Sequence, residues 1–300
     1  MKKVLVIAGP TAVGKSDFAI EIAKKYNLEI ISGDSIQVYQ GLDVGSGKVT
    51  EEEMDGVKHH LIDILSPKES YSVSLFQTMA RKLIDTSDKP LIICGGTGLY
   101  LKACLYDYSF SEEKAPAYDP SLEKYTNEEL YEMLKESDPL QASKIHPNNR
   151  RRVMRSLTIQ KNTGTSQSEI EQEQKHEMLY DALIIGCTMD REKLYERINQ
   201  RVEKMFGSGL EKEVKHLLDT GVTFEDTSME GIGYKEWNAY FYGDSNIEEV
   251  KKEIQKHSRN FAKRQYTWLN HQMPVDWYDV SSKEDKERIL NEIDTFLKGE

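Results

Sequence analysis

The chain has 300 residues, of which 38% are hydrophobic and 30% charged, so it can build a sizeable core and is not a disordered, collagenous or coiled-coil sequence. Its 40 basic and 51 acidic side chains give a formal net charge of −11, which by itself disfavours a polyanionic partner. No apolar run approaches the roughly 20 residues that a membrane-spanning helix needs, so we expect no membrane association.

The first hundred residues alternate short apolar runs with helical patterns. Strands are predicted at 3–8, 29–32 and 91–94, and a later one at 183–187. The runs are apolar throughout, as is typical of parallel strands that are covered on both faces. Helices are predicted between the first two strands and at 74–85. This order predicts an α/β fold with a parallel sheet flanked by helices.

A polar, helical segment interrupts this pattern between residues 111 and 180. Thr126 and Glu129 form a capping box before one helix, and a second helix is predicted to begin near Pro147 and Asn148 and to end near Gly164. The sequence therefore predicts a core domain, 1–110 and 181–300, and an all-helical insertion domain, 111–180.

The remainder of the chain is predicted to be helical. One apolar stripe runs from Leu194 to Met205, stops at the glycines 207 and 209, and resumes from Leu210 to Leu217. Further helices are predicted at 247–270 and around 289–296.

The strongest motif follows the first strand and reads GPTAVGKS, matching G-x-x-x-x-G-K-[ST] between a strand and an amphipathic helix. Such a loop wraps an anion with backbone N–H groups at a helix N-terminus, the lysine adds a full charge, and the serine hydroxyl can hold Mg²⁺. The predicted phosphate-binding residues are Gly9, Pro10, Thr11, Ala12, Val13, Gly14, Lys15 and Ser16, with Ser16 as the metal ligand.

The acidic residue that a P-loop ATPase places after a later strand is missing here. The strand at 91–94 runs into Gly95-Gly96-Thr97 without an acid, and only Asp63, in the weak strand-like run 60–64, could replace it. Generic ATP hydrolysis is therefore disfavoured. Asp34 follows the second strand, and because ligands bind beyond the carboxyl ends of parallel strands, we expect it near the bound anion. A carboxylate there suits a general base, although an ordinary turn role is the alternative.

Two basic segments stand out in the acidic chain. Residues 139–168 contain six basic and no acidic side chains, and residues 251–273 contain six basic residues and one acidic residue. Helical spacing places Arg151 with Arg155 on one face, and Arg259, Lys263 and Tyr266 on another. Cations beside an aromatic ring suit phosphate contacts and base stacking on RNA.

Two further groups of residues bear on anions and metals. Arg197 and Arg201, four residues apart, could add cations to the phosphate site or form surface ion pairs. The seven histidines show no metal-ligand spacing. The odd number of cysteines, three, without a Cys-x-x-Cys pair, disfavours a disulfide framework or a zinc site and predicts a cytoplasmic protein.

Taken together, these motifs resemble the bacterial tRNA dimethylallyltransferases. The matching stretches run in order over most of the chain and include GPTAVGKS, GDSIQVYQGLDVGSGK, GGTGLYLKA, IHPNNRRRVMRSL, GIGYKEW and FAKRQYTWL. One departure is Asn149, where the family usually has aspartate.

The resemblance implies Mg²⁺-assisted transfer of a dimethylallyl group from dimethylallyl diphosphate to N6 of the adenosine just 3′ of the anticodon. It implies that the loop around Lys15 holds the donor diphosphate, although the motif is often taken for an ATP site. Asp34 maps to the general base and Thr97 to the hydroxyl near the reacting amine. Partners would be the tRNA anticodon stem-loop and the prenyl donor, and we expect a monomer. The residues expected at the tRNA are Asp34, Ser35, Ile36, Gln37, Arg151, Arg152, Val153, Met154, Arg155, Gly231, Gly233, Tyr234, Lys235, Arg259, Lys263, Arg264 and Tyr266.

Two other interpretations remain open on sequence alone. One is a P-loop kinase of a nucleotide or small metabolite, with Asp34 as its base, and the other is a non-catalytic RNA-binding NTP switch. The basic, aromatic-bearing segments favour the RNA-modifying enzyme, because a kinase of a small molecule does not need them.

Overall fold

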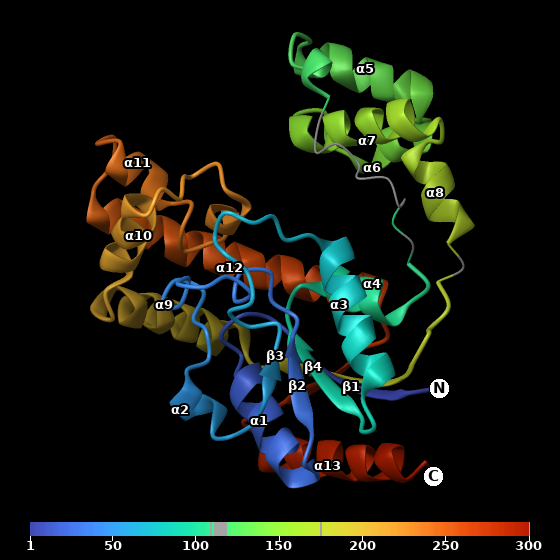
Figure 1. Ribbon diagram of the computed structural model, residues 1–300, viewed down its shortest axis with the longest axis vertical. Helices are drawn as coiled ribbons and strands as arrows, with labels where there is room; N and C mark the ends of the chain where they lie inside the picture. Colours follow the sequence, from blue (N-terminus) through green and yellow to red (C-terminus); the bar gives the residue numbers. More distant parts are fainter. Residues whose placement is uncertain (109, 111–118, 175, 300) are drawn as a thin grey trace. The chain divides into compact units, whose positions relative to one another are not determined.

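The computed structural model describes residues 1–108, 110, 119–174 and 176–299. The chain forms two compact units, one of residues 1–106 and 178–300 and the other of residues 107–177 (Figure 1). The first residues of the predicted insertion, 111–118, lie outside the described residues.

The larger unit is built on a six-stranded, all-parallel sheet with strand order β3-β2-β4-β1-β5-β6, which confirms the predicted fold class. In the middle of the sheet Val6 lies between Ile93 and Ile184. The outer strands β3 and β6 were not predicted correctly, because one is a pair of histidines and the other is a four-residue strand with an aspartate at each end. The strands are β1 (Lys3–Ala8), β2 (Glu29–Ser32), β3 (His59–His60), β4 (Leu91–Gly95), β5 (Asp181–Thr188) and β6 (Asp276–Asp279).

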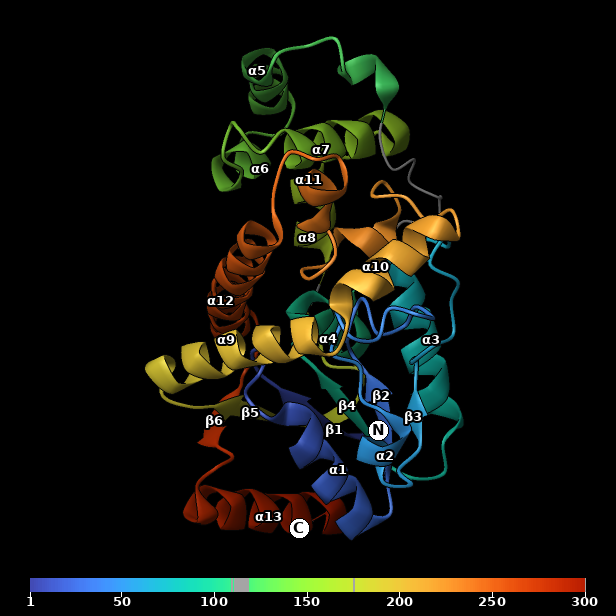
Figure 2. The same cartoon turned by 90° about the vertical axis from the view of Figure 1, so that its left-hand side faces the viewer.

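Helices cover both faces of this sheet. One face packs against α1 and α13, and the other against α3 and α4 (Figures 1 and 2). Helices α9 and α12 pack on each other, and α12 also packs on α4. The helices of this unit are α1 (Lys15–Tyr26), α2 (Glu51–Met54), α3 (Val73–Thr86), α4 (Gly98–Leu105), α9 (Arg191–Gly207), α10 (Leu210–Asp219), α11 (Trp237–Phe241), α12 (Ile247–Gln272) and α13 (Lys283–Lys298), with a 3-10 turn at Thr227–Glu230.

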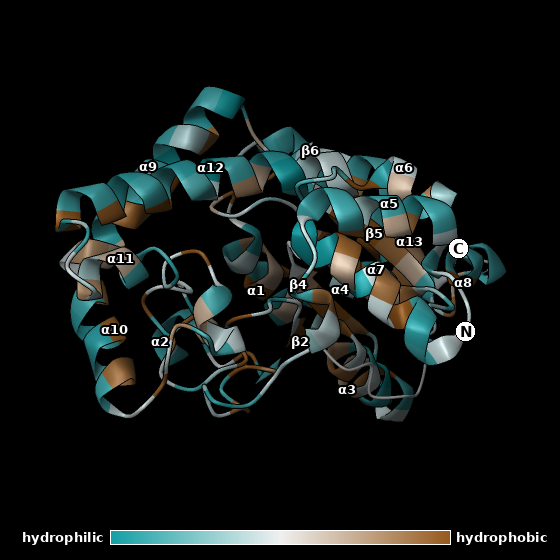
Figure 3. Ribbon diagram, turned by 90° about the horizontal axis from the view of Figure 1, so that it is seen from above, coloured by the Kyte–Doolittle hydropathy of each residue, from teal (hydrophilic) through white to brown (hydrophobic). Residues whose placement is uncertain are grey.

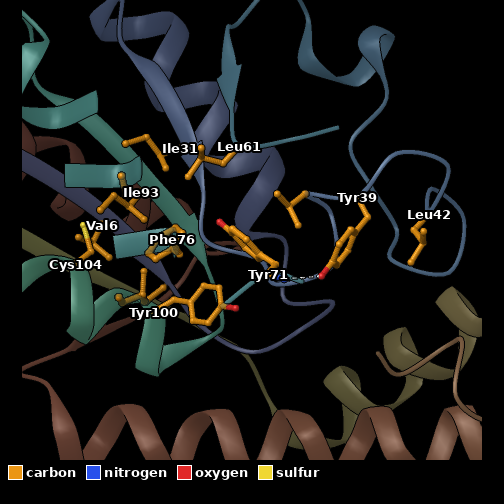
Figure 4. Packing of buried hydrophobic residues seen from close by; sticks show 14 of the residues in the cluster. Val6, Ile31, Tyr39, Leu42, Leu61, Tyr71, Phe76, Ile93, Tyr100 and Cys104 are labelled. Carbon is orange, nitrogen blue, oxygen red and sulfur yellow. Dashed lines mark hydrogen bonds between the residues drawn. The ribbon is translucent and has the colours of Figure 1, made fainter. Parts of the chain in front are cut away.

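Strand alternation divides the apolar core into two layers. Leu5 and Ile7 face α1 and α13, whereas Val4 and Val6 face α3 and α4, and all four side chains are fully buried. The second layer is rich in aromatic rings (Figure 4). The rings of Phe76 and Tyr100 are stacked, with their centroids 4.9 Å apart. The helices alternate hydrophilic and hydrophobic residues along their length, as amphipathic helices do (Figure 3).

The smaller unit is helical in its described part. The predicted capping box is confirmed: Glu129 N–H donates to Thr126 Oγ1 at 3.2 Å, and Thr126 N–H donates to Glu129 Oε2 at 2.8 Å. The predicted start of the second helix is slightly wrong, because Asn149 is its N-cap and Pro147 lies in the preceding turn. The elements are a 3-10 turn at Pro120–Leu122, α5 (Asn127–Ser137), α6 (Pro139–Lys144), α7 (Arg150–Thr163) and α8 (Gln167–Glu173).

No helix among the described residues has the length and hydrophobicity needed to cross a membrane.

Candidate active site

The glycine-rich loop between β1 and α1 adopts backbone conformations that few side chains tolerate. Gly9, Ala12 and Gly14 have φ values of 143°, 65° and 101°. A Cβ on Gly9 would lie 2.5 Å from the carbonyl oxygen of Cys187, so β5 passes too closely for any other residue. Gly14 is the N-cap of α1. The loop therefore wraps around the N-terminus of α1, where backbone N–H groups and the helix dipole favour an anion.

Lys15 and Ser16 open α1 beneath this loop. Lys15 Nζ donates to the carbonyl oxygen of Pro10 at 2.5 Å. Burial lowers the pKa of Lys15, and the nearby Asp34 carboxylate acts in the opposite direction. Within the described residues the Ser16 hydroxyl has no hydrogen-bond partner and remains available to a ligand.

The two arginines of α9, Arg197 and Arg201, lie at the phosphate-binding loop. This is the first of the two roles that the sequence left open for them. Arg201 donates to Thr11 Oγ1 at 3.3 Å and to the carbonyl oxygen of Ser46 at 3.0 Å. Burial lowers the pKa of Arg201, opposed by Asp34. The exposed Arg197 guanidinium lies against Gly14. Both cations therefore face the loop rather than forming an ion pair of the kind found on protein surfaces.

Asp34 and Thr97 follow neighbouring strands, β2 and β4. The two strand ends are joined by a hydrogen bond from Gly33 N–H to the carbonyl oxygen of Cys94 at 2.8 Å. Asp34 Oδ1 accepts from the N–H groups of Ile36 at 2.8 Å and of the next residue at 3.2 Å, so the expected turn role is real. Its Oδ2 and the Thr97 hydroxyl have no hydrogen-bond partner within the described part of the chain.

A cavity of about 300 Å³ is lined by Asp34, Thr97, Arg201 and two residues of the phosphate-binding loop, Thr11 and Ala12. Charged side chains alternate with apolar ones along its wall, and the apolar residues come mainly from α9 and α12. A carboxylate, a hydroxyl and a guanidinium thus line one cavity, which is an arrangement suited to removing a proton from a bound nucleophile. The lining residues are Thr11, Ala12, Asp34, Ser35, Ile36, Gly45, Ser46, Thr97, Ile198, Arg201, Val202, Met205, Glu230, Gly231, Ile232, Lys235, Ile254, Ser258, Phe261 and Arg264.

Gln265 on α12 is a site residue that the sequence analysis missed. Its Oε1 accepts from Thr11 N–H at 2.9 Å, and its Nε2 donates to the carbonyl oxygen of Gly96 at 3.0 Å. It thus joins the phosphate-binding loop to the loop after β4. The sequence did carry a signal, because Gln265 is a polar residue on the buried face of α12 that includes Ala262 and Leu269.

The segment Gly231–Lys235 contributes less surface than predicted. Gly231 and Lys235 line the cavity, but Gly233 and Tyr234 are buried. Tyr234 is fully buried and hydrogen-bonded inside the unit, so the expectation that its side chain faces tRNA is wrong.

Helix α12 presents only part of its expected basic face. Lys263 and Arg264 are exposed, and Arg259 donates to Asn199 Oδ1 at 2.6 Å. Tyr266 packs its ring on Trp277 at 5.0 Å and hydrogen-bonds Thr188 through its hydroxyl. Tyr266 is therefore part of the internal packing, and the prediction that it stacks on an unpaired base does not fit this arrangement.

The basic helix α7 separates into two faces. Arg151, Arg152 and Arg155 are exposed, whereas Val153 and Met154 belong to the core of the smaller unit, with exposures of 0% and 3%. The two apolar residues of this run therefore hold the helix in place and do not form a surface for RNA.

The residues that follow strand β2 are also divided between the cavity and the fold. Ser35 and Ile36 line the cavity, while the Gln37 amide hydrogen-bonds Ser32 Oγ and the carbonyl oxygen of Gly47. Gln37 therefore stabilises the loop rather than facing the cavity.

Asp63, the candidate replacement for the missing acid, pairs with Lys48 and does not line the cavity. Strand β3 ends at residue 60, and Asp63 follows in a turn with φ of 54°. Within the described residues no three His, Cys, Asp or Glu side chains gather to hold a metal. Mg²⁺ commonly takes only one or two protein ligands beside substrate phosphates, so the free Ser16 hydroxyl is compatible with it.

Comparisons with known proteins agree over nearly the whole chain. Residues 37–272 match the family described as IPP transferase. The tRNA dimethylallyltransferase of Anoxybacillus flavithermus is 49% identical across 99% of this chain and 97% of its own, and that of Bacillus subtilis is 46% identical across 99% and 96%.

Solved structures give the same result. The chain resembles the tRNA isopentenylpyrophosphate transferase of Staphylococcus epidermidis with a TM-score of 0.73, 43% identity and coverage of 98% and 99%. A eukaryotic dimethylallyltransferase acting on tRNA matches with a TM-score of 0.84, 29% identity, and coverage of 100% of this chain and 80% of that one.

Proposed function

Because the chain belongs to the IPP transferase family, we propose that it is a tRNA dimethylallyltransferase. It transfers the dimethylallyl group of dimethylallyl diphosphate to N6 of the adenosine just 3′ of the anticodon and releases diphosphate. One observation carries this assignment at the level of the site: the phosphate-binding loop, Arg201 and Asp34 meet at a single cavity.

The leaving group binds at the loop end of the cavity. As the bond between C1 of the prenyl group and the diphosphate oxygen breaks, negative charge develops on diphosphate. The loop amides, Lys15 and the two arginines of α9 stabilise that charge. A partly buried setting strengthens these interactions, because less water competes for them.

The nucleophile enters from the side of Asp34. As N6 of adenine forms its bond to C1, Asp34 Oδ2 takes the N6 proton, while Oδ1 stays bound to the backbone and fixes the orientation of the carboxylate. Thr97 lines the same cavity, and its hydroxyl positions the amine. The adenine must leave its stack to reach this point.

We propose Mg²⁺ as the cofactor, held by the Ser16 hydroxyl and the oxygens of the donor diphosphate. When bound, it neutralises charge on the leaving group. The protein would be a cytoplasmic monomer that binds the anticodon stem-loop through the exposed cations of α7 and α12. Its cysteines at 94, 104 and 187 are free, as expected in a reducing compartment.

The assignment is tested by incubating the protein with labelled dimethylallyl diphosphate and unmodified tRNA in Mg²⁺. We expect label in tRNA, and nuclease digestion should recover it on the adenosine 3′ of the anticodon. A parallel reaction with γ-labelled ATP tests the kinase alternative. Rapid phosphoryl transfer without prenylation of tRNA would overturn the proposal, and binding of RNA and nucleotide without either reaction would favour the switch.

A further inference from the structure

Glu213 on α10 is bound by four donors, although nothing in the proposed chemistry uses it. Its Oε2 accepts from the N–H groups of Asp43 at 3.1 Å and Val44 at 2.7 Å. Its Oε1 accepts from Gly45 N–H at 3.0 Å and from the Tyr234 hydroxyl at 2.8 Å. One carboxylate thus fills a concave row of three consecutive backbone N–H groups, a geometry that otherwise binds anions.

Tyr234 extends this row by one residue. Its hydroxyl, which donates to Glu213, accepts from Ser46 N–H at 3.1 Å. The turn is closed by a hydrogen bond from Gly47 N–H to the carbonyl oxygen of Val44 at 3.0 Å. Glu213 and Tyr234 together therefore fix residues 43–47, which we call the clamp loop.

The clamp loop in turn holds Arg201. The Ser46 carbonyl oxygen accepts from Arg201 Nη2 at 3.0 Å, and Gly47 lies so close that a Cβ would overlap the guanidinium group. The other end of the guanidinium donates to Thr11 Oγ1. Ser46 C=O lies in the same planar peptide group as Gly47 N–H, so the hydrogen bond from Gly47 N–H to the Val44 carbonyl also fixes the orientation of the Ser46 carbonyl.

We propose that Glu213 is a positioning residue for the diphosphate end of the site: through the clamp loop it sets the orientation in which Arg201 meets the leaving group. This inference rests on the proposed function, since it takes Arg201 as a ligand of the donor diphosphate. It predicts an effect on the donor alone, because the tRNA-facing cations are on other segments.

The test compares Glu213→Gln with Glu211→Gln, a change of the same kind on the same helix. Glu211 accepts from the Tyr240 hydroxyl and, within the described residues, shares no hydrogen bond with the clamp loop. A glutamine at position 213 has a single acceptor oxygen, and its NH2 group can only donate. Some of the N–H groups of the clamp loop therefore lose their acceptor. Glu213→Gln should raise the KM for dimethylallyl diphosphate and the Kd for inorganic diphosphate roughly tenfold, with the KM for tRNA unchanged. Glu211→Gln should match the wild type in all three.

A double-mutant cycle with Arg201→Ala separates positioning from general damage. If Glu213 acts through Arg201, Glu213→Gln should add nothing to the loss caused by Arg201→Ala. Tyr234→Phe removes only the hydroxyl that accepts from Ser46 N–H and donates to Glu213. It should raise the KM for dimethylallyl diphosphate and the Kd for inorganic diphosphate by a smaller factor, and it provides a second test if Glu213→Gln does not fold.

Two results would overturn the inference. The first is a folded Glu213→Gln variant that binds inorganic diphosphate with the wild-type Kd. The second is a double variant in which the fold-losses of Glu213→Gln and Arg201→Ala multiply, because independent effects on affinity would do so. If instead Arg201→Ala and Lys15→Ala both leave diphosphate binding unchanged, the proposed diphosphate site itself fails, so the two failures can be told apart.

Discussion

Asp34 uses its two carboxylate oxygens differently. Asp34 lines the cavity; its Oδ1 is bound to the N–H groups of Ile36 and Gln37, whereas its Oδ2 has no hydrogen-bond partner in the described part of the chain. The turn role and the general-base role, which the sequence presented as alternatives, are therefore compatible in one side chain. A base fixed by its own backbone needs no rearrangement before it accepts a proton.

Asp34→Asn tests this division of labour. Asparagine keeps an oxygen for the two N–H groups but cannot take the N6 proton, so kcat should fall roughly 10²- to 10⁴-fold while the Kd for inorganic diphosphate stays near the wild-type value. Single-turnover kinetics with calorimetry measure both. An unchanged kcat would remove Asp34 as the base.

Gly9 tests the close approach of β5 to the phosphate-binding loop. Gly9→Ala places a methyl group against the Cys187 carbonyl at a backbone conformation that alanine rarely adopts, so it should lower the free energy of unfolding by about 2 kcal/mol or more. The control is Gly207→Ala on α9, where a Cβ meets no atom within 4 Å. That change should be neutral or stabilising by up to about 1 kcal/mol. Equal effects in denaturant titration would contradict the strain at Gly9.

At the level of the element, α7 and α12 each divide their residues between packing and exposed charge. On α7 the arginines at 151, 152 and 155 lie outward, while Arg150 turns inward and donates to the carbonyl oxygens of Tyr125 and Glu123. Basic composition alone does not separate these roles, because a guanidinium group can bind a phosphate or a backbone carbonyl equally well.

Two substitutions on α7 separate the faces. Arg155→Ala should weaken tRNA binding and reduce the slope of log K against log salt by about 1, with little change in stability. Met154→Ala should leave the slope unchanged and lower the free energy of unfolding by roughly 2–5 kcal/mol. Binding titrations at several salt concentrations and denaturant unfolding measure the two. A normal slope in Arg155→Ala would place that residue outside the interface.

The smaller unit carries an acid-sensitive link between its 3-10 turn and α7. Lys161 Nζ lies 2.5 Å from Asp119 Oδ2 and lowers the pKa of Asp119 to about 2. A depressed pKa stabilises the fold above the ordinary value of 3.8, and this contribution is lost as the pH falls towards 2. NMR titration should find the midpoint near 2, and Lys161→Met should move it back towards 3.8. A midpoint unaffected by that substitution would contradict the link.

The whole molecule combines a net charge of −11 with exposed cations in both compact units. Binding of a polyanion then depends on where charge is placed rather than on its sum. Arg155 belongs to the smaller unit and Lys263 to the larger one, so two separate parts of the chain present basic side chains.

If both units hold the same tRNA, their contributions to salt dependence should add. Arg155→Ala and Lys263→Ala should each reduce the slope by about 1, and the double variant by about 2. Lys283→Ala, which removes an exposed cation at the start of α13, should leave the slope unchanged. A double variant no worse than either single one would mean that only one unit touches the RNA.

The sequence by itself determined the elements whose local pattern is strong. The apolar strands, the capping box at Thr126, the phosphate-binding loop and the position of Asp34 after a strand all depend on neighbours within a few residues, so they are visible in the chain. Of the two outermost strands, β3 was seen only as a weak strand-like run at 60–64 and β6 was not predicted, because strands this short form only through pairing with the sheet.

Only the tertiary structure decided which polar residues serve the site and which serve the fold. Tyr234 and Tyr266 looked like surface residues for RNA, but Tyr234 is buried and Tyr266 is partly buried against Trp277. Glu213 and Gln265 looked like ordinary helix residues and hold the loops of the cavity. Their hydrogen-bond partners lie between 21 and 254 residues away in the chain. The same side chain can bind solvent, backbone or ligand, so only the assembled packing determines which partner it meets.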